Sequence, residues 1–274
     1  MRQTDSTSFV YHRYCKSTRR GLNQAIPITI HGLIGDDIFE LVRKTNSFYE
    51  ADLLGRIGFL MGRHADVIVD VGANIGNHTL YFSKVLGAKV ICVEPNPAAL
   101  VLLQKNLEMN EVTGQVTIVK AAASDHSGSL RLENGPLSNL GMAKVMEAAK
   151  VGSIEIASIT LDEMISSVLS EEDARISLVK IDVEGFEQNV LRGALKTIAQ
   201  HGPIIVVEAA TPESHRAIES MLARFGYHCL GPFASTPTYI FCQSHFLCLA
   251  ATFWWFLARA ARFIVRKCDR QPSS

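Results

Sequence analysis

The sequence has no excess of charge of either sign, because 27 lysine and arginine residues balance 27 aspartate and glutamate residues. Domains that bind nucleic acid usually carry a basic surface, so this balance argues against a polynucleotide substrate. No internal repeat is visible in the 274 residues. A chain of this length can form one large core, and we expect a single catalytic domain with short appendages.

Cysteine pairs that could bind metal are also missing. The six cysteines lie far apart, without a C-x-x-C pair and without clustered histidines. We therefore expect reduced, structural thiols and no bound metal. The N-terminus is basic, but no apolar run follows its charges, so we expect no secretory signal and a cytoplasmic protein.

Short apolar runs alternate with helical patterns from about Ile26 onward, which is typical of βαβ units in a mostly parallel sheet. Buried strands are expected at residues 67–71, 90–93, 116–121, 177–183 and 204–207. Helices are expected at residues 77–86, 97–109, 186–198 and 212–225. Asn96 and Pro97 suit the N-cap and first helical position of the second helix.

Residues 124–159 interrupt this alternation with several glycines and a proline, and show only weak strand patterns. We interpret them as an insertion over one edge of the fold, where loops often shape a substrate pocket. The expected organisation is a basic N-terminal segment (1–25), a catalytic domain (26–243) and an apolar, basic C-terminal helix (244–274).

The strongest motif, at residues 67–82, reads VIVDVGANIGNHTLYF. It predicts a buried strand, a glycine turn and an amphipathic helix whose N-terminal amides can face an anion. The turn glycines, Gly72 and Gly76, have G-x-x-x-G spacing, which differs from the G-x-G-x-x-G of dinucleotide sites. Asp70 would repel a pyrophosphate, but it could bind the ammonium of a methionine group whose carboxylate faces the turn amides.

Glu94 ends the next strand, where an acid can accept both hydroxyls of a ribose. A methionine group and a ribose together indicate S-adenosyl-L-methionine as cofactor. The alternative is an ordinary tight turn beside two surface acids. In the AAASD turn, Ser124 or Asp125 could meet the adenine, although a simple polar turn explains these residues equally well.

The remaining candidates follow the later strands. Asp182 ends the fourth predicted strand, near the expected reactive end of the cofactor, and is the best candidate for general base. Glu184 and Glu208 are candidates for substrate binding, against the alternatives of a helix-dipole partner and a solvated strand end. For His78 and His215, the pattern favours a surface position over a catalytic one.

Four segments together resemble the FkbM family of methyltransferases: DVGANIGNHTLYFSK, VICVEPNPAALVLLQKNL, AAASDHSG and LVKIDVEGFEQNVLRGA. The resemblance spans roughly residues 45 to 243. It implies a Rossmann-like class I α/β fold, with a seven-stranded, mostly parallel sheet and a final hairpin at residues 227–230 and 238–242. It also implies O-methylation of hydroxyl groups, commonly on bacterial sugars or polyketides. The residues that match the cofactor motifs are Asp70, Gly72, Asn74, Gly76 and Glu94; Asp182 and Glu184 match the fourth-strand motif.

We therefore expect an O-methyltransferase acting on a sugar hydroxyl of a glycan or glycolipid. The alternatives are a polyketide or other small-molecule acceptor and a catalytically silent protein that binds S-adenosyl-L-methionine. The tail places Trp254 and Trp255 beside arginines at helical spacing, which predicts peripheral membrane association through residues 245–268. A helix docked on the domain or on a partner is the alternative there, and the oligomeric state is not indicated.

Overall fold

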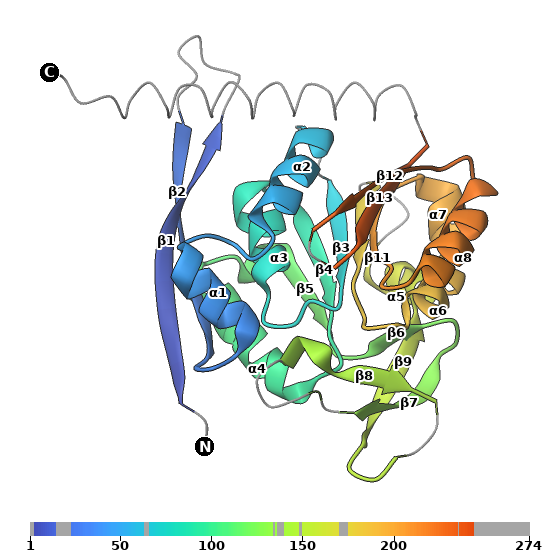
Figure 1. Ribbon diagram of the computed structural model, residues 1–274, viewed down its shortest axis with the longest axis horizontal. Coiled ribbons are helices and arrows are strands. Elements are labelled where there is room, and N and C mark those ends of the chain that lie inside the picture. Colours follow the sequence, from blue (N-terminus) through green and yellow to red (C-terminus); the bar gives the residue numbers. More distant parts are fainter. Residues whose placement is uncertain are drawn as a thin grey trace, which may run out of the picture.

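The computed structural model describes residues 3–14, 23–62, 66–133, 135, 140–147, 150–169, 175–234 and 236–243. Its centre is a seven-stranded sheet with the order β12-β13-β11-β10-β3-β4-β5 (Figure 1). The strands are β3 (Val67–Val71), β4 (Lys89–Val93), β5 (Val116–Val119), β10 (Ile176–Ile181), β11 (Ile204–Glu208), β12 (His228–Phe233) and β13 (Thr238–Cys242).

Strand directions confirm the predicted α/β class. Strands β5, β4, β3, β10 and β11 pair in parallel, whereas β13 is antiparallel to both β11 and β12. The chain thus forms a Rossmann-like, mostly parallel sheet that ends in a hairpin with one reversed strand. The residues predicted for β3 and β13 agree with the observed bounds.

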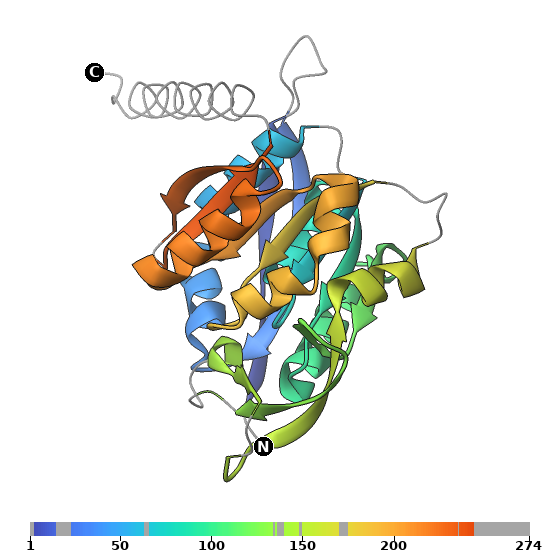
Figure 2. The same ribbon diagram turned by 90° about the vertical axis from the view of Figure 1, so that its right-hand side faces the viewer.

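Eight α-helices of the described chain cover the two faces of the sheet (Figures 1 and 2). They are α1 (Asp37–Thr45), α2 (Ala51–Met61), α3 (Asn77–Leu80), α4 (Pro97–Met109), α5 (Leu161–Val168), α6 (Glu187–Arg192), α7 (Leu195–His201) and α8 (Pro212–Ala223). Alternate residues of β3 serve opposite faces: Ile68 packs with α1 to α4, and Val69 packs with α5 to α8. A strand buried on both sides explains the continuous apolar run in the sequence.

Helix bounds were predicted best where the sequence contains a cap. Asn96 accepts a hydrogen bond from the amide of Ala98 at 3.0 Å, and Pro97 begins α4, as expected. Two other predicted helices are divided. The one over residues 77–86 continues from α3 as a π-helical turn at Tyr81–Val85, and the one over residues 186–198 breaks at Gly193 into α6 and α7.

The N-terminal region differs from the expected separate segment. Strands β1 (Thr4–Tyr14) and β2 (Asn23–Leu33) form an antiparallel hairpin that packs on the domain (Figure 1). Phe9 and Ile28 are buried in the main core, and Asn106 of α4 accepts the amide of His31 at 2.6 Å. The predicted boundary between residues 25 and 26 is therefore wrong, because it divides a hairpin whose apolar face belongs to the catalytic domain.

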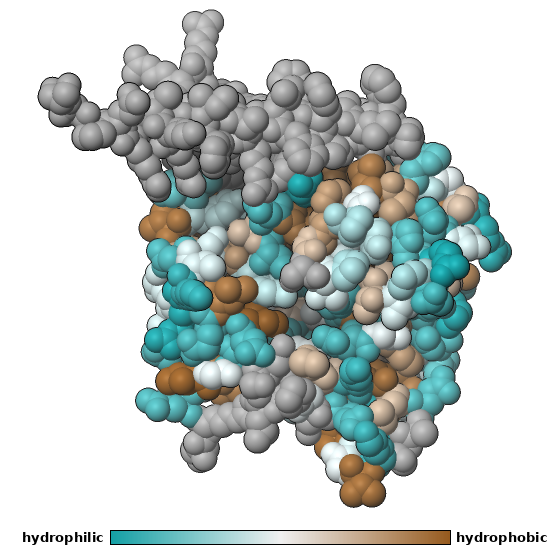
Figure 3. All heavy atoms as spheres, viewed as in Figure 1, coloured by the Kyte–Doolittle hydropathy of each residue, from teal (hydrophilic) through white to brown (hydrophobic). Residues whose placement is uncertain are grey.

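The predicted insertion contains a second, smaller sheet of four strands in the order β6-β9-β7-β8. Its strands are β6 (Ala122–Ser124), β7 (Gly128–Glu133), β8 (Lys144–Met146) and β9 (Ile154–Thr160). The weak strand patterns at residues 130–132 and 154–159 fall in β7 and β9. Hydrophobic residues on the face seen in Figure 3 are interspersed with hydrophilic ones.

The expected membrane-interface helix belongs to the C-terminal end of the chain. Within the part that the structure describes, no helix has the length and apolar character needed to span a bilayer. Residues 244–274, including the predicted membrane-interface segment, lie outside the described residues, so that association stays a prediction.

The thiols of Cys92 and Cys229 are free, but Cys242 is disulfide-bonded, so the expectation of reduced cysteines is wrong for Cys242.

Candidate active site

Strand register brings the predicted residues to one edge of the sheet. Val71 lies beside Val93 in β4 and beside Ile181 in β10, and Ile181 in turn lies beside Val207 in β11. The residues that follow these positions therefore gather at the carboxyl edge, where ligands bind in open α/β sheets. They are Gly72, Glu94, Asp182 and Glu208.

Lys180 is the central charge of this edge, and the sequence analysis missed it. Its side chain is only 6% exposed, and its ammonium nitrogen lies 3.4 Å from Asp70 Oδ1 and 3.5 Å from Asp182 Oδ2. It also donates to the carbonyl of Gly72 at 2.9 Å. Burial acts to lower the pKa of Lys180, but the charges of Asp182 and Asp70 raise it overall, so the lysine is a cation. The sequence could have revealed this ion pair, since Lys180 lies in a predicted buried strand and a buried lysine needs an anionic partner such as Asp182.

Asp70 occupies a different position from the expected one. Its carboxylate has no exposed surface; it accepts a hydrogen bond from Thr79 Oγ1 at 2.6 Å and pairs with Lys180. A ligand ammonium could not reach it without displacing these partners. In this structure Asp70 therefore binds Thr79 and Lys180, and its carboxylate is not exposed.

The glycine turn has the backbone conformation that its sequence predicts. Gly72, Asn74 and Gly76 all have positive φ angles, of 76°, 50° and 91°. The amides of Gly72 and Ala73 donate to the carbonyl of Val93 at 3.0 and 3.2 Å. The sequence predicted that turn amides would bind a cofactor carboxylate. The amides of Gly72 and Ala73 do not meet this expectation, because they already donate hydrogen bonds within the protein. The two glycines instead allow close packing within the protein, because a Cβ atom at Gly72 would overlap the carbonyl of Asp182 and one at Gly76 would overlap Leu103.

Glu94 lies directly beside this turn. It is 6% exposed and accepts the backbone amides of Asn74 and Asn96, each at 2.8 Å. Burial raises the pKa of Glu94 to about 7, although the two amides act in the opposite direction. Each carboxylate oxygen has a further lone pair, so the group can accept hydroxyl donors in addition to the amides.

Three carboxyl groups meet at the ends of β10 and β11. Carboxylate oxygens of Asp182, Glu184 and Glu208 lie within 4.8 Å of one another. Burial, together with a hydrogen bond to Asp182, raises the pKa of Glu208 to about 9. Burial also acts to raise the pKa of Asp182, but the neighbouring Lys180 charge and that hydrogen bond lower it. Near neutral pH the pair therefore holds one proton, on Glu208, and Asp182 is ionised.

His78 was expected at the surface, and this expectation is wrong. The residue is 7% exposed, and its Nε2 atom lies 3.4 Å from Glu50 Oε2. Both side chains line a pocket that also contains Lys180 and Asp182. The sequence pattern did not reveal that His78 is buried, because the short helix that carries it is buried on all sides. Glu50 was not considered, because it precedes the first motif.

Ser124 and Asp125, the candidates for contact with adenine, differ in their exposure to a ligand. Ser124 is fully buried in β6 and donates to Asp125 Oδ1 at 3.2 Å. The Asp125 side chain is 30% exposed and bonds to His126 at 2.8 Å, which lowers the pKa of Asp125. Only Asp125 thus offers a group to a ligand at this position.

The turn region fits an adenosylated methionine. Asn74 Oδ1 is a buried acceptor that has no partner among the described residues, and it stands next to the Glu94 carboxylate. A buried acceptor of this kind normally has a donor. Hydroxyl and ammonium groups of S-adenosyl-L-methionine are donors of the required type, and Asn74 and Glu94 would hold them.

Known proteins that are similar to this chain are methyltransferases. A model of the FkbM methyltransferase domain matches residues 70–229. The hexuronic acid methyltransferase AglP of Haloferax volcanii is 34% identical over 141 residues, which cover 52% of this chain and 55% of AglP. The methyltransferase sdnD of Sordaria araneosa is 31% identical over 189 residues, covering 58% of this chain and 73% of sdnD. This chain thus spans about half the length of AglP.

Among solved structures, the similarity is lower. The FkbM methyltransferase of Methylobacillus flagellatus aligns with a TM-score of 0.46 and 21% identity, covering 65% of this chain and 43% of that protein.

Proposed function

The chain belongs to the FkbM methyltransferase family, and from this premise we propose that it methylates a sugar hydroxyl with S-adenosyl-L-methionine as cofactor. The observation that carries the proposal is the position of the Asp182 carboxylate at the carboxyl edge, 3.5 Å from the buried ammonium of Lys180 and next to the Glu208 carboxyl group. S-adenosyl-L-methionine supplies an electrophilic methyl group when it is bound.

The protein contributes position and a base. Glu94 and Asn74 would bind the hydroxyl and ammonium donors of the cofactor. The Asp182 carboxylate would take the proton of the acceptor hydroxyl. Lys180 keeps Asp182 ionised, and Glu208, which carries the shared proton, fixes its orientation through their hydrogen bond. A positioned base contributes about 10²- to 10⁴-fold in rate.

The charge of the pocket supports a hydroxyl acceptor over a carboxylate acceptor. Methylation of a carboxylate needs no base, and the ionised Asp182, one of three clustered carboxyl groups, would repel an anion at the reacting position. The same groups, together with Glu50 in the pocket, can accept hydrogen bonds from several hydroxyls. A sugar presents hydroxyls in this manner. The name of AglP as a hexuronic acid methyltransferase supports a sugar acceptor, but a hexuronic acid has both hydroxyls and a carboxylate, so the name does not select the methylated group.

The full chain should be incubated with isotopically labelled S-adenosyl-L-methionine and with two acceptors. One acceptor is an oligosaccharide that contains a hexuronic acid, and the other is a non-sugar alcohol of similar size. We expect labelled product from the oligosaccharide, with the label in an alkali-stable ether. An alkali-labile ester would contradict hydroxyl transfer, and turnover of the non-sugar alcohol alone would favour the small-molecule alternative.

A silent binding protein is the remaining alternative, and the same experiment addresses it. Calorimetry with S-adenosylhomocysteine would then show binding, while no acceptor of either class gives product. Asp182→Asn is the matched catalytic control, because it keeps the shape of the side chain and removes the base.

A further inference from the structure

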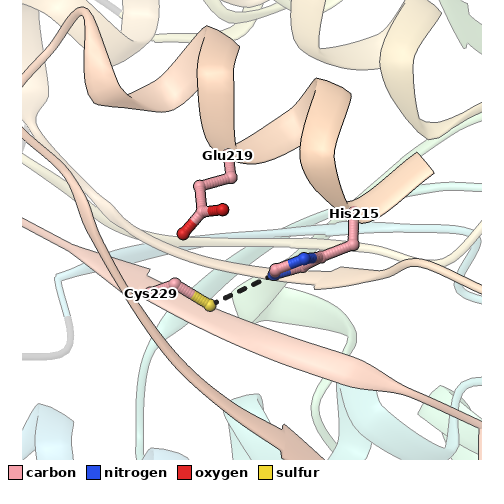
Figure 4. A group of neighbouring side chains, drawn as sticks. All are labelled: His215, Glu219 and Cys229. Atoms are coloured by element: carbon pink, nitrogen blue, oxygen red, sulfur yellow. Dashed lines mark hydrogen bonds between the residues drawn. The ribbon is translucent and has the colours of Figure 1, made fainter. Parts of the chain in front are cut away.

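A second group of metal-binding side chains, which shares no residue with the carboxyl cluster, lies between α8 and β12. His215 and Glu219 are four residues apart on α8, so they project from the same side of the helix. Cys229 faces them from β12 (Figure 4). One donor atom from each residue lies within 4.8 Å of the other two.

The distances suit a tetrahedral ion. His215 Nε2 lies 3.4 Å from Cys229 Sγ. Two such ligands on one tetrahedral zinc ion, with usual bond lengths, would be about 3.6 Å apart. The imidazole is also held in place, because it stacks on Tyr239 with ring centroids 4.0 Å apart. Glu219 is exposed, so its carboxylate can move toward the other two groups without disturbing the core.

The chemistry of the three donors selects the ion. A thiolate and an imidazole favour zinc and related transition metals over magnesium or calcium, which prefer oxygen ligands only. Burial, with the nearby Glu219 charge, raises the pKa of Cys229 to about 11, so the metal-free thiol is protonated. Zinc binding would replace that proton: the S–H bond breaks, a Zn–S bond forms, and one proton passes to solvent.

We propose that His215, Glu219 and Cys229 form a binding site for a zinc ion, with a fourth position open to water or an external ligand. The site connects α8 to the edge strand β12 and is separate from the proposed catalytic groups. Sequence spacing did not indicate it, because the cysteine lies on a different element from the histidine and glutamate.

Cobalt(II) can report this site directly, because a bound thiolate gives a ligand-to-metal charge-transfer band in the near ultraviolet. Tag-free full-length protein should be titrated with cobalt(II), and zinc affinity should then be measured by competition with a chromophoric chelator. We expect a saturable thiolate band that zinc abolishes. Cys229→Ser should remove this band, and His215→Ala should weaken zinc binding by more than the roughly 10- to 100-fold typical of changes outside the first shell.

Matched controls separate the site from other metal-binding groups of the chain. Glu213→Gln changes an exposed acid on the same helix, and His12→Ala changes an exposed histidine on β1; both should bind zinc like the wild type. A wild-type protein without a thiolate band would overturn the proposal, as would a band that persists in Cys229→Ser.

A second measurement covers variants that fold poorly. Iodoacetamide labelling of the wild-type protein, followed by peptide mass spectrometry, should show Cys229 protected by zinc, whereas buried Cys92 should be unreactive with and without zinc. Equal labelling of Cys229 in both states would mean that its contact with His215 is only a hydrogen bond.

Discussion

Replacing Gly72 with alanine should lower the free energy of unfolding by about 2 to 5 kcal/mol. Gly72 has a φ angle of 76°, and a residue with a Cβ atom pays roughly 1 to 2 kcal/mol for this left-handed conformation. A Cβ atom there would also overlap the backbone carbonyl of Asp182. Backbone cannot move as a side chain end can, so overpacking adds about 1 to 3 kcal/mol.

Urea denaturation of three alanine variants separates these two costs. Gly87 has a φ angle of 74°, and nothing lies within 4 Å of the position that an added methyl group would take, so Gly87→Ala should show the conformational cost alone. Gly55 lies inside α2 without a positive φ, and Gly55→Ala should stabilise the protein by about 0.5 to 1 kcal/mol. If Gly72→Ala and Gly87→Ala agree within about 0.5 kcal/mol, the close approach of the turn to Asp182 is not as described.

Further predictions concern three residues of the site, Asp182, Glu94 and Lys180. Asp182→Asn should lose about 10²- to 10⁴-fold in turnover while calorimetry shows unchanged affinity for S-adenosylhomocysteine. A wild-type rate would transfer the role of base to another group, and His78→Gln tests a histidine that lines the same pocket. The pKa of Glu94 is raised to about 7, so the free protein should lose stability as pH rises through 7. Ribose hydroxyls donate best to the ionised form, so affinity for S-adenosylhomocysteine should increase between about pH 6 and 8, and Glu94→Gln should flatten this dependence; a wild-type affinity independent of pH would contradict ribose binding by Glu94. Lys180→Met would leave the buried Asp70 carboxylate without its partner and should cost about 3 to 5 kcal/mol in urea denaturation, whereas near-wild-type stability would show that Asp70 does not depend on the ion pair.

The sequence by itself determined the parallel strands of the central sheet, the helical segments over residues 77–86, 97–109, 186–198 and 212–225, and the edge where the site lies. Buried parallel strands are apolar on both faces, so β3 and β11 were visible as continuous runs, and α4 was bounded by its own cap. Positive φ angles at Gly72 and Gly76 followed from the residue type. Acids that end parallel strands reach one edge whatever the loops do, which is why Glu94, Asp182 and Glu208 could be grouped in advance.

Only the tertiary structure decided which of these groups face a ligand and which neutralise one another. Asp70 is enclosed by Thr79 and Lys180, although its motif predicted contact with a cofactor. His78 is buried beside Glu50, although its pattern predicted a surface position. The N-terminal hairpin joined the core for the same reason, since its apolar face is covered by residues far along the chain. Burial and ion pairing depend on contacts between distant segments, and local sequence patterns carry no record of such contacts.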